Sequence, residues 1–246
     1  MTDLSAITAF AGSAKPALRE ELERAIVEAG SHSTQDLLAM ITYQLGWTGA
    51  DAGTQAEGKN LRGLFCLLAC QAAGGKWQQA LPAAAAVELI HNFSLIHDDI
   101  EDNGSIRRGR PTVWMIWGEA QAINTGDAIF ALANASLLGL AETVSQEAAF
   151  LASRLFHATC LRLTQGQHLD IAFEELDKIE VETYWEMVRG KTAALVAFSL
   201  QVGALCGGAD YTIQSHYYDF GHYLGLAFQV LDDILGIWGE EERTGK

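Results

Sequence analysis

Basic residues are scarce in this chain. Its 246 residues include 16 lysines and arginines against 31 aspartates and glutamates, which gives a formal net charge of −15. A surface this acidic argues against nucleic acid, or an anionic membrane surface, as a partner. Any site for an anion must therefore be a local cluster of the few basic side chains.

Cysteine and long apolar runs are also in short supply. The cysteines form no C-x-x-C pair and have no histidines at metal-binding spacing, so we expect reduced thiols at Cys66, Cys70, Cys160 and Cys206. No apolar run reaches the roughly 18 residues of a membrane-spanning helix, and the opening MTDLSAITAF lacks the basic region of a secretory signal. These features predict a cytoplasmic protein with no stable membrane insertion.

The scarcity of proline, with three in the whole chain, favours helices. Apolar residues recur at a spacing near 3.6, and no strand pattern is found. A glycine-rich loop is expected at 46–58, and helices are expected at 13–30, 34–45, 58–73, 83–100, a short one from 112, 125–141, 145–175, 180–206 and 213–238. We therefore expect an all-α fold, with residues 1–246 forming one antiparallel bundle of nine or ten helices around a central cavity.

The most distinctive stretch places four carboxylates in five residues and then three arginines in four: Asp98, Asp99, Glu101, Asp102, Arg107, Arg108 and Arg110. On a helix, Asp98 and Asp102 share one face, close to the stripe that carries His91. Like charges at this spacing destabilise a helix, and an all-oxygen ligand set favours a hard cation, Mg²⁺ before Zn²⁺. The arginines suit a polyanion such as a diphosphate.

This acidic and basic stretch has two other possible interpretations. A solvated, charged helix end followed by a turn stays open for the segment taken alone. A calcium loop starting at Asp99 is excluded, because its twelfth position is Arg110 where a bidentate glutamate is required.

Basic residues occur at two further places. Lys59 and Arg62 lie in the first turn of a predicted helix, where the helix dipole disfavours cations. A bound anion there would resolve the conflict, and two solvated cations are the open alternative. Lys191 and Thr192 follow Gly190 inside a predicted helix, and a glycine at that place indicates close approach to a ligand or a kink.

Polar residues on two other predicted helices complete the pattern. Gln167 and Asp170 share one face, and Gln229 shares a face with Asp232, next to Asp233, in an apolar helix. If the acidic helices face each other, they can hold several Mg²⁺ ions that a diphosphate would bridge. Neutralised in this way, the diphosphate becomes a leaving group, and apolar helices below can shield the resulting carbocation from water.

Taken in order, these motifs resemble the trans-isoprenyl diphosphate synthases, the polyprenyl synthetase family. Asp98-Asp99-x-x-Asp102 followed by Arg107-Arg108-Gly is similar to the family's first aspartate-rich motif, and Gln229 with Asp232-Asp233 to the second. The resemblance implies that Asp98, Asp102 and Asp232 bind about three Mg²⁺ ions per site, and that Asp233 and Lys191 also act in catalysis. It further implies an allylic diphosphate held by Arg107, Lys191 and Thr192, with Gln167, Asp170 and Gln229 lining the site, and an isopentenyl diphosphate held by Lys59, Arg62, His91 and Arg108.

The implied reaction is a head-to-tail 1′-4 condensation by a homodimer, without a side-chain nucleophile. Phe93, five residues before Asp98, is expected to close the pocket floor beside the small Ser94, which predicts geranylgeranyl diphosphate as product, with farnesyl diphosphate next. A terpene cyclase would not need the second set of cations, and a non-catalytic partner subunit would be expected to have lost aspartates.

Three departures from the family pattern are visible. Asn60 and Gly63 replace residues common beside Lys59 and Arg62, and Gly236 stands where the second motif has a fifth-position carboxylate. The chain also stops at Lys246, which fits a site-closing lysine of the family, and the family's further C-terminal helices are expected to be missing.

Overall fold

The computed structural model describes residues 4–29 and 35–238. In chain order its elements are α1 (Leu4–Ala29), α2 (Gln35–Gln44), α3 (Thr54–Glu57), α4 (Leu61–Ala72), the 3-10 helix η1 (Trp77–Ala80), α5 (Leu81–Glu101), β1 (Ile106–Arg107), β2 (Arg110–Pro111), α6 (Val113–Trp117), α7 (Glu119–Leu138), the 3-10 helix η2 (Gly139–Glu142), α8 (Gln146–Phe173), α9 (Val181–Val188), the π-helical turn η3 (Arg189–Ala193), α10 (Ala194–Cys206) and α11 (Tyr211–Trp238). The predicted all-α fold is confirmed.

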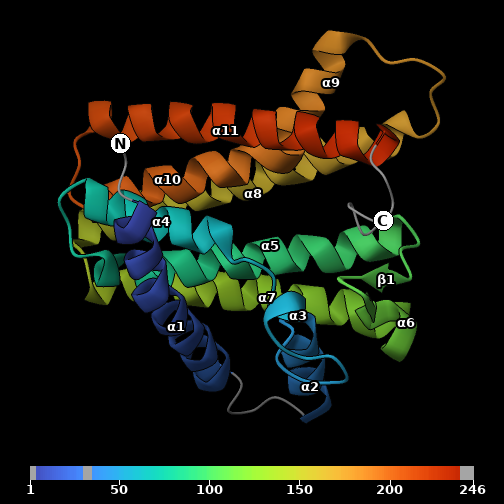
Figure 1. Cartoon of the computed structure of the whole chain (residues 1–246), viewed down its shortest axis with the longest axis horizontal. Coiled ribbons are helices and arrows are strands. Elements are labelled where there is room, and N and C mark those ends of the chain that lie inside the picture. The colour runs from blue at the N-terminus through green and yellow to red at the C-terminus, as the bar shows by residue number, and fades with distance from the viewer. Residues whose placement is uncertain (1–3, 30–34, 239–246) are drawn as a thin grey trace.

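Helix α10 lies at the centre of the bundle. It packs against α4, α5, α8 and α11, and all of its residues except Gln201 are buried. A helix that is apolar on every side is stable only when neighbours cover every side. Below it, α5 and α7 run side by side, and α1 crosses the end of both (Figure 1). Consecutive alanines at 83–86 bring the start of α5 close to its neighbours, and each is fully buried.

Most predicted helix boundaries hold to within a few residues. Ser145 accepts a hydrogen bond from the Ala148 N–H and starts α8, and Thr112 precedes α6. The predicted start at Thr125 is wrong. Helix α7 begins after Gly118, and the Thr125 hydroxyl instead donates to the Gln121 carbonyl one turn back. Residues 4–12, which precede the first predicted helix, belong to α1, and the predicted loop at 46–58 contains α3.

The predicted helix 180–206 is interrupted by η3. Gly190 in this turn packs against Gly166 of α8, and a Cβ on Gly190 would lie 2.7 Å from the Arg162 carbonyl oxygen. The glycine therefore serves the close contact of two helices, not the contact with a ligand that the sequence left open. π-helical turns of this kind often occur at functional sites.

The expectation that the chain has no strands is wrong in one place. Strands β1 and β2 pair antiparallel as a hairpin, with Ile106 opposite Pro111 and Arg107 opposite Arg110. At its tip, Arg108 and Gly109 both have positive φ, of 53° and 75°, as a tight type I′ hairpin turn requires. Two-residue strands are too short to leave an alternating pattern in the sequence.

The four cysteines are free, as predicted, and burial raises the pKa of Cys70 to about 11. Within residues 4–29 and 35–238, none of the helices has the length and apolar character to span a membrane.

Candidate active site

A cavity of about 620 Å³ opens between α5, α8, η3 and α11. The predicted site residues that line it are Arg62, His91, Phe93, Ser94, Asp98, Arg107, Arg108, Gln167, Asp170, Lys191, Thr192, Gln229, Asp232 and Asp233. Residues up to 171 positions apart in the sequence thus meet in one place, as the motif order predicted. Lys59 and Asp102 are exposed and are not among the lining residues, and Lys246 lies outside the described residues.

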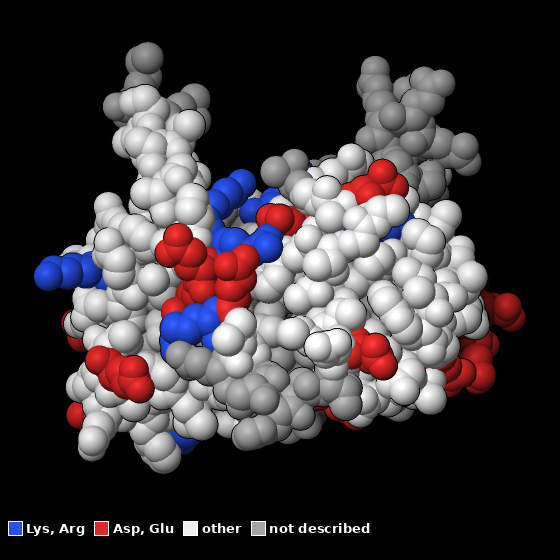
Figure 2. Space-filling model, turned by 90° about the horizontal axis from the view of Figure 1, so that it is seen from below, with Lys and Arg blue, Asp and Glu red and all other residues white. Residues whose placement is uncertain are grey.

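One wall of the cavity carries the first acidic motif. Asp98 points into the cavity from α5, and burial raises the pKa of its carboxyl to about 6, with Asp102 and Glu101 adding to the rise and Lys191 opposing it. Asp102 forms the C-cap of α5 one turn later. The face seen in Figure 2 has acidic side chains gathered directly beside basic ones. An added cation would lower the free energy of such a carboxylate cluster.

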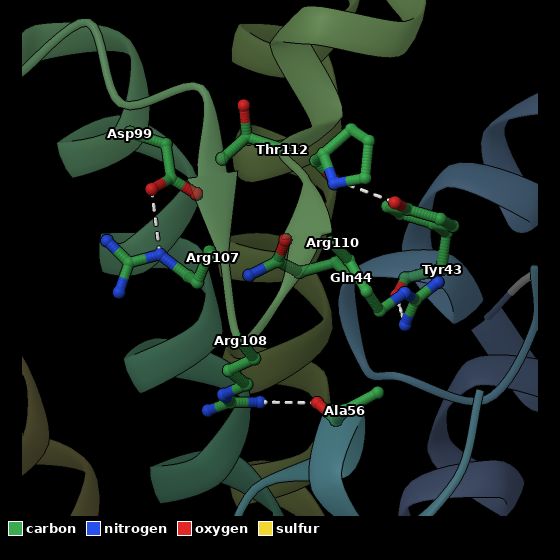
Figure 3. Close-up of a pocket in the computed structure, with 9 residues that line it drawn as sticks. Tyr43, Gln44, Ala56, Asp99, Arg107, Arg108, Arg110 and Thr112 are labelled. Atoms are coloured by element: carbon green, nitrogen blue, oxygen red, sulfur yellow. Dashed lines mark hydrogen bonds and ion pairs between the residues drawn. The ribbon is translucent and has the colours of Figure 1, made fainter. Parts of the chain in front are cut away.

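Asp99 has a different role from its neighbour. It is 4% exposed, and it accepts a hydrogen bond of 2.7 Å from the Arg107 Nε, which joins α5 to the hairpin (Figure 3). Burial raises the pKa of Asp99, and the Arg107 guanidinium opposes the rise. The aspartate therefore orients Arg107 instead of facing the cavity.

A cluster of cations occupies the next part of the wall. The Arg62 Nη1 lies 3.2 Å from the His91 Nε2, and Arg108 is close enough to lower the pKa of both groups. Burial, with the two arginines, holds the pKa of His91 well below its usual range, so its ring is neutral at pH 7. The Arg62 Nε is buried without a hydrogen-bond partner. Two neighbouring arginines, one with a donor that has no hydrogen-bond partner, favour an incoming anion.

Glu88 supports this cluster from below. Its carboxylate accepts a hydrogen bond of 2.7 Å from the Gly63 N–H, and its charge acts on Arg62. Gly63 has no room for a side chain, because a Cβ there would lie 2.7 Å from Leu18 and 3.0 Å from Glu88. The departure from the family pattern at Gly63 thus accompanies the close packing of α4 on α5.

The opposite wall is a chain of hydrogen bonds over three elements. The Thr192 hydroxyl donates to the Gln229 Oε1 at 2.5 Å, the Gln229 Nε2 donates to the Asp233 Oδ1 at 2.7 Å, and the Tyr184 hydroxyl donates to the Asp233 Oδ2 at 2.6 Å. Both oxygens of Asp233 are therefore engaged within the protein. Asp232 lines the cavity beside it.

Lys191 lies between the two walls. Its Nζ forms an ion pair with Asp170 and is 4.0 Å from the Asp98 Oδ1. Burial opposes the charge on Lys191, but Asp98 and Asp170 outweigh it and raise the lysine pKa. Gln167, one turn before Asp170, donates to the Glu101 Oε2 at 2.7 Å. The ammonium is thus held where the acidic groups of α5 and α8 approach each other.

Aromatic rings lie around Phe93, which lines the cavity. The Phe93 ring lies 4.6 Å from the His97 ring and 5.2 Å from the Phe130 ring, and Ser94 turns its hydroxyl to the His91 carbonyl. Phe93 and Ser94 both line the cavity, as predicted.

The carboxylates that line the cavity are possible ligands for a divalent metal ion. Within the described residues, no three His, Cys, Asp or Glu side chains converge closely enough to hold an ion by themselves. Carboxylate oxygens on both walls nevertheless suit a hard cation such as Mg²⁺. The pKa of Asp98 is raised mainly by burial, and the charges of Asp102 and Glu101 add to the rise. The arrangement fits Mg²⁺ ions that complete their coordination with a bound diphosphate.

Sequence reasoning missed three contributors. Glu101 binds Gln167, Tyr184 binds Asp233, and Glu88 supports the Arg62 cluster. Glu88 lies within the predicted helix 83–100, and Glu101 follows it directly. A glutamate in the otherwise apolar segment around position 88 was a usable signal. Tyr184 is 49 residues from Asp233, and nothing in the sequence links the two.

The family model for polyprenyl synthetase matches residues 49–246. A geranylgeranyl diphosphate synthase of Mycobacterium tuberculosis is 42% identical over 248 residues, which cover 97% of this chain and 70% of that protein. A (2E,6E)-farnesyl diphosphate synthase of Mycobacterium bovis is 41% identical over 210 residues, 84% of this chain and 57% of the relative. The crystal structure of a polyprenyl synthetase from Streptomyces coelicolor matches with a TM-score of 0.86 and 38% identity, over 97% of this chain and 69% of that one.

The similarity extends over most of the chain. The chain therefore belongs to the polyprenyl synthetase family, the trans-isoprenyl diphosphate synthases, which are prenyltransferases of isoprenoid biosynthesis.

Proposed function

We propose that this protein is a Mg²⁺-dependent short-chain trans-prenyltransferase that condenses isopentenyl diphosphate with an allylic diphosphate, head to tail, to give geranylgeranyl diphosphate, with farnesyl diphosphate next. The observation that carries the proposal is a single cavity lined by carboxylates on two walls, by a separate cation cluster and by the Phe93 ring. A synthase and a cyclase both need the carboxylates on two walls, whereas only the synthase needs the separate cation cluster.

The acidic walls and Lys191 bind the allylic substrate. Asp98, Asp102 and Asp232 hold the Mg²⁺ ions, about three in number, and when bound these ions supply the positive charge that neutralises the departing diphosphate. Arg107, held by Asp99, contacts the same diphosphate together with Lys191 and Thr192. Gln167, Asp170, Gln229 and Asp233 act on the site through the hydrogen bonds described above, and Lys191 is fixed by Asp170.

The cation cluster binds isopentenyl diphosphate. Arg62 and Arg108 donate to its diphosphate, the neutral His91 ring adds a further donor, and Lys59 approaches from the segment before α4. This diphosphate does not leave in the reaction, so it needs cations but no metal. The C3–C4 double bond of isopentenyl diphosphate then attacks the allylic C1, and a proton is lost to the released diphosphate. Phe93 closes the floor and stops the growing chain.

Two alternatives stay within the same fold. A terpene cyclase has no use for a second diphosphate pocket, so Arg62, His91 and Arg108 count against it. A non-catalytic partner subunit would have no reason to retain Asp98, Asp170 and Lys191 in contact.

We also propose that residues 1–246 form one domain, because one apolar core joins α1, α4, α5, α7, α8 and α10. A homodimer, which rests on the family resemblance, and a cytoplasmic location, which rests on the free cysteines, belong to the same proposal. Lys246 as the site-closing lysine is part of it as well.

The test is to incubate the protein with isopentenyl diphosphate and, in turn, dimethylallyl, geranyl or farnesyl diphosphate, with and without Mg²⁺. Mass analysis of the dephosphorylated products is expected to give linear prenols of twenty carbons, only with Mg²⁺. Cyclic hydrocarbons would assign the protein to the cyclases. The absence of turnover with every allylic substrate would overturn the proposal.

A further inference from the structure

The hairpin that carries Arg107 and Arg108 is fastened to the segment between α2 and α4. On the side away from the cavity, Arg110 is 6% exposed, and its Nη2 donates to the Thr48 carbonyl at 2.7 Å. Its guanidinium lies over the Tyr43 ring at 4.0 Å (Figure 3). The Tyr43 hydroxyl donates in return to the Pro111 carbonyl at 2.7 Å. Arg110 thus donates to the backbone that follows α2, and Tyr43 donates to the backbone of the hairpin, so the two parts are joined in both directions.

The segment is shaped to receive these side chains. Gly49 has a φ of +92°, and a Cβ there would lie 2.8 Å from the Tyr43 ring and 2.9 Å from the Arg110 Nη2. Gly58 has a φ of +73°, and a Cβ there would lie 2.7 Å from the Arg108 Cζ. Only glycine has both the backbone freedom and the absence of a side chain that these two contacts require.

The two ends of this segment serve the same site. The Arg108 Nη1 donates to the Ala56 carbonyl at 2.9 Å, close to the point where the chain passes through Lys59 into α4 and Arg62. The two halves of the cation cluster, one on the hairpin and one at the start of α4, thus meet through residues 46–58. A shift of the hairpin against this segment would separate Arg108 from Arg62.

We propose that Arg110 and Tyr43 are positioning residues that lock the hairpin onto residues 46–58 and so set the distance between Arg108 and Arg62. Neither residue contacts substrate. That the substrate bound by Arg108 and Arg62 is isopentenyl diphosphate rests on the proposed function. The expected effect of Arg110 and Tyr43 on the affinity for a diphosphate does not. The diphosphate of isopentenyl diphosphate does not leave in the reaction, so it is bound equally in the ground and transition states. Loss of the contacts of Arg110 and Tyr43 therefore weakens binding of this substrate more than it slows turnover.

The principal variant is Arg110→Met, which keeps the aliphatic stem and removes the guanidinium. It is expected to raise the KM for isopentenyl diphosphate at least ~10-fold, with kcat and the KM for the allylic substrate changed less than ~3-fold. Arg110→Lys keeps the charge without the planar fork, so it is expected to restore little of the affinity. Tyr43→Phe removes only the hydroxyl and is expected to have an intermediate effect. Arg154→Met, at an exposed position of α8 outside the cavity, is the control.

Calorimetric titration of the same proteins with inorganic diphosphate, without Mg²⁺ or prenyl substrate, separates this inference from the proposed function. Weaker diphosphate binding by Arg110→Met and Tyr43→Phe, with binding by Arg154→Met unchanged, supports the lock even if the wild-type protein makes no prenyl product. Unchanged diphosphate affinity in Arg110→Met and Tyr43→Phe overturns it, and so does a fall in kcat with KM unchanged, which marks a loss of folded protein. Should Arg110→Met fail to fold, Tyr43→Phe and Arg110→Lys decide the matter in the same assay.

Discussion

The Lys191 ammonium lies 4.0 Å from the Asp98 carboxylate while it is paired with Asp170, so a single cation bridges the acidic residues of α5 and α8 before any metal is bound. The neighbouring Asp99, one residue along the same helix, is instead paired with Arg107. Successive residues of a helix point about 100° apart, and the two aspartates of this motif therefore have separate tasks.

Substitution of each aspartate by asparagine should separate the metal-binding role of Asp98 from the Arg107-orienting role of Asp99. Asp98→Asn removes a carboxylate that faces the cavity and is expected to lower kcat/KM by at least ~100-fold, by analogy with the loss of one preorganised electrostatic contact. Asp99→Asn leaves an oxygen that still accepts from the Arg107 Nε, so a loss below ~10-fold is expected. Steady-state kinetics, with Mn²⁺ affinity measured alongside, would contradict this separation if both variants lost metal binding equally.

The pH dependence of metal binding should follow Asp98. Because its pKa is about 6 in the metal-free protein, protons compete with the metal below that pH, and affinity is expected to fall up to ~10-fold per pH unit. The effect of rising pH on the free energy of unfolding of the metal-free protein has the opposite sign. A carboxyl whose pKa rises from 3.8 to about 6 on folding stabilises the metal-free fold below pH 3.8, and this contribution disappears as the pH rises through 6.

Titration of Mn²⁺ at pH 5, 6 and 7.5 measures the first effect. Asp98→Asn serves as the control, and its weaker binding should be nearly independent of pH over this range. A wild-type affinity that is the same at pH 5 and 7.5 would remove Asp98 from the ligand set.

The contact between Gly166 and Gly190 should not tolerate a methyl group. In Gly190→Ala the new Cβ would meet the Arg162 carbonyl, and overpacking of this kind costs about 1–3 kcal/mol of unfolding free energy. Since Lys191 follows directly, kcat is expected to fall as well. Gly12→Ala on α1 is the matched control: a Cβ there meets no atom within 4 Å, so ~0.4–1 kcal/mol of stabilisation is expected. Urea unfolding compares the two, and equal stability of both variants would refute the contact.

Phe93 should determine the product length. Phe93→Ala opens the floor toward Phe130 and is expected to lengthen the products by one or more five-carbon units. Ser94→Ala, which loses only a hydroxyl bonded to the His91 carbonyl, is the control and should leave the products unchanged. Product mass decides between them, and an unchanged product from Phe93→Ala would place the floor elsewhere.

Sequence could predict what depends on spacing along one element. The placement of Asp98 and Asp102 one turn apart follows from helical geometry alone. The bond from Tyr184 to Asp233 and the packing of Gly190 on Gly166 depend on how distant helices meet, and no local pattern records that. Prediction is also limited within one helix, because a threonine side chain can either cap a helix or donate to a carbonyl one turn earlier. Helix α7 begins after Gly118, and Thr125 donates to the Gln121 carbonyl. The hairpin at 106–111 is set by tertiary contacts of Arg110 and by a two-residue turn.

The central claim is that the cavity holds two diphosphates at once, one that leaves and one that stays. The most direct measurement is diphosphate release from farnesyl diphosphate with Mg²⁺, with and without isopentenyl diphosphate. A condensing enzyme predicts release that depends on isopentenyl diphosphate and equals the amount of C20 product formed. Release of the same size from farnesyl diphosphate alone would contradict the claim, because the cation cluster of Arg62, His91 and Arg108 would then have no substrate to bind.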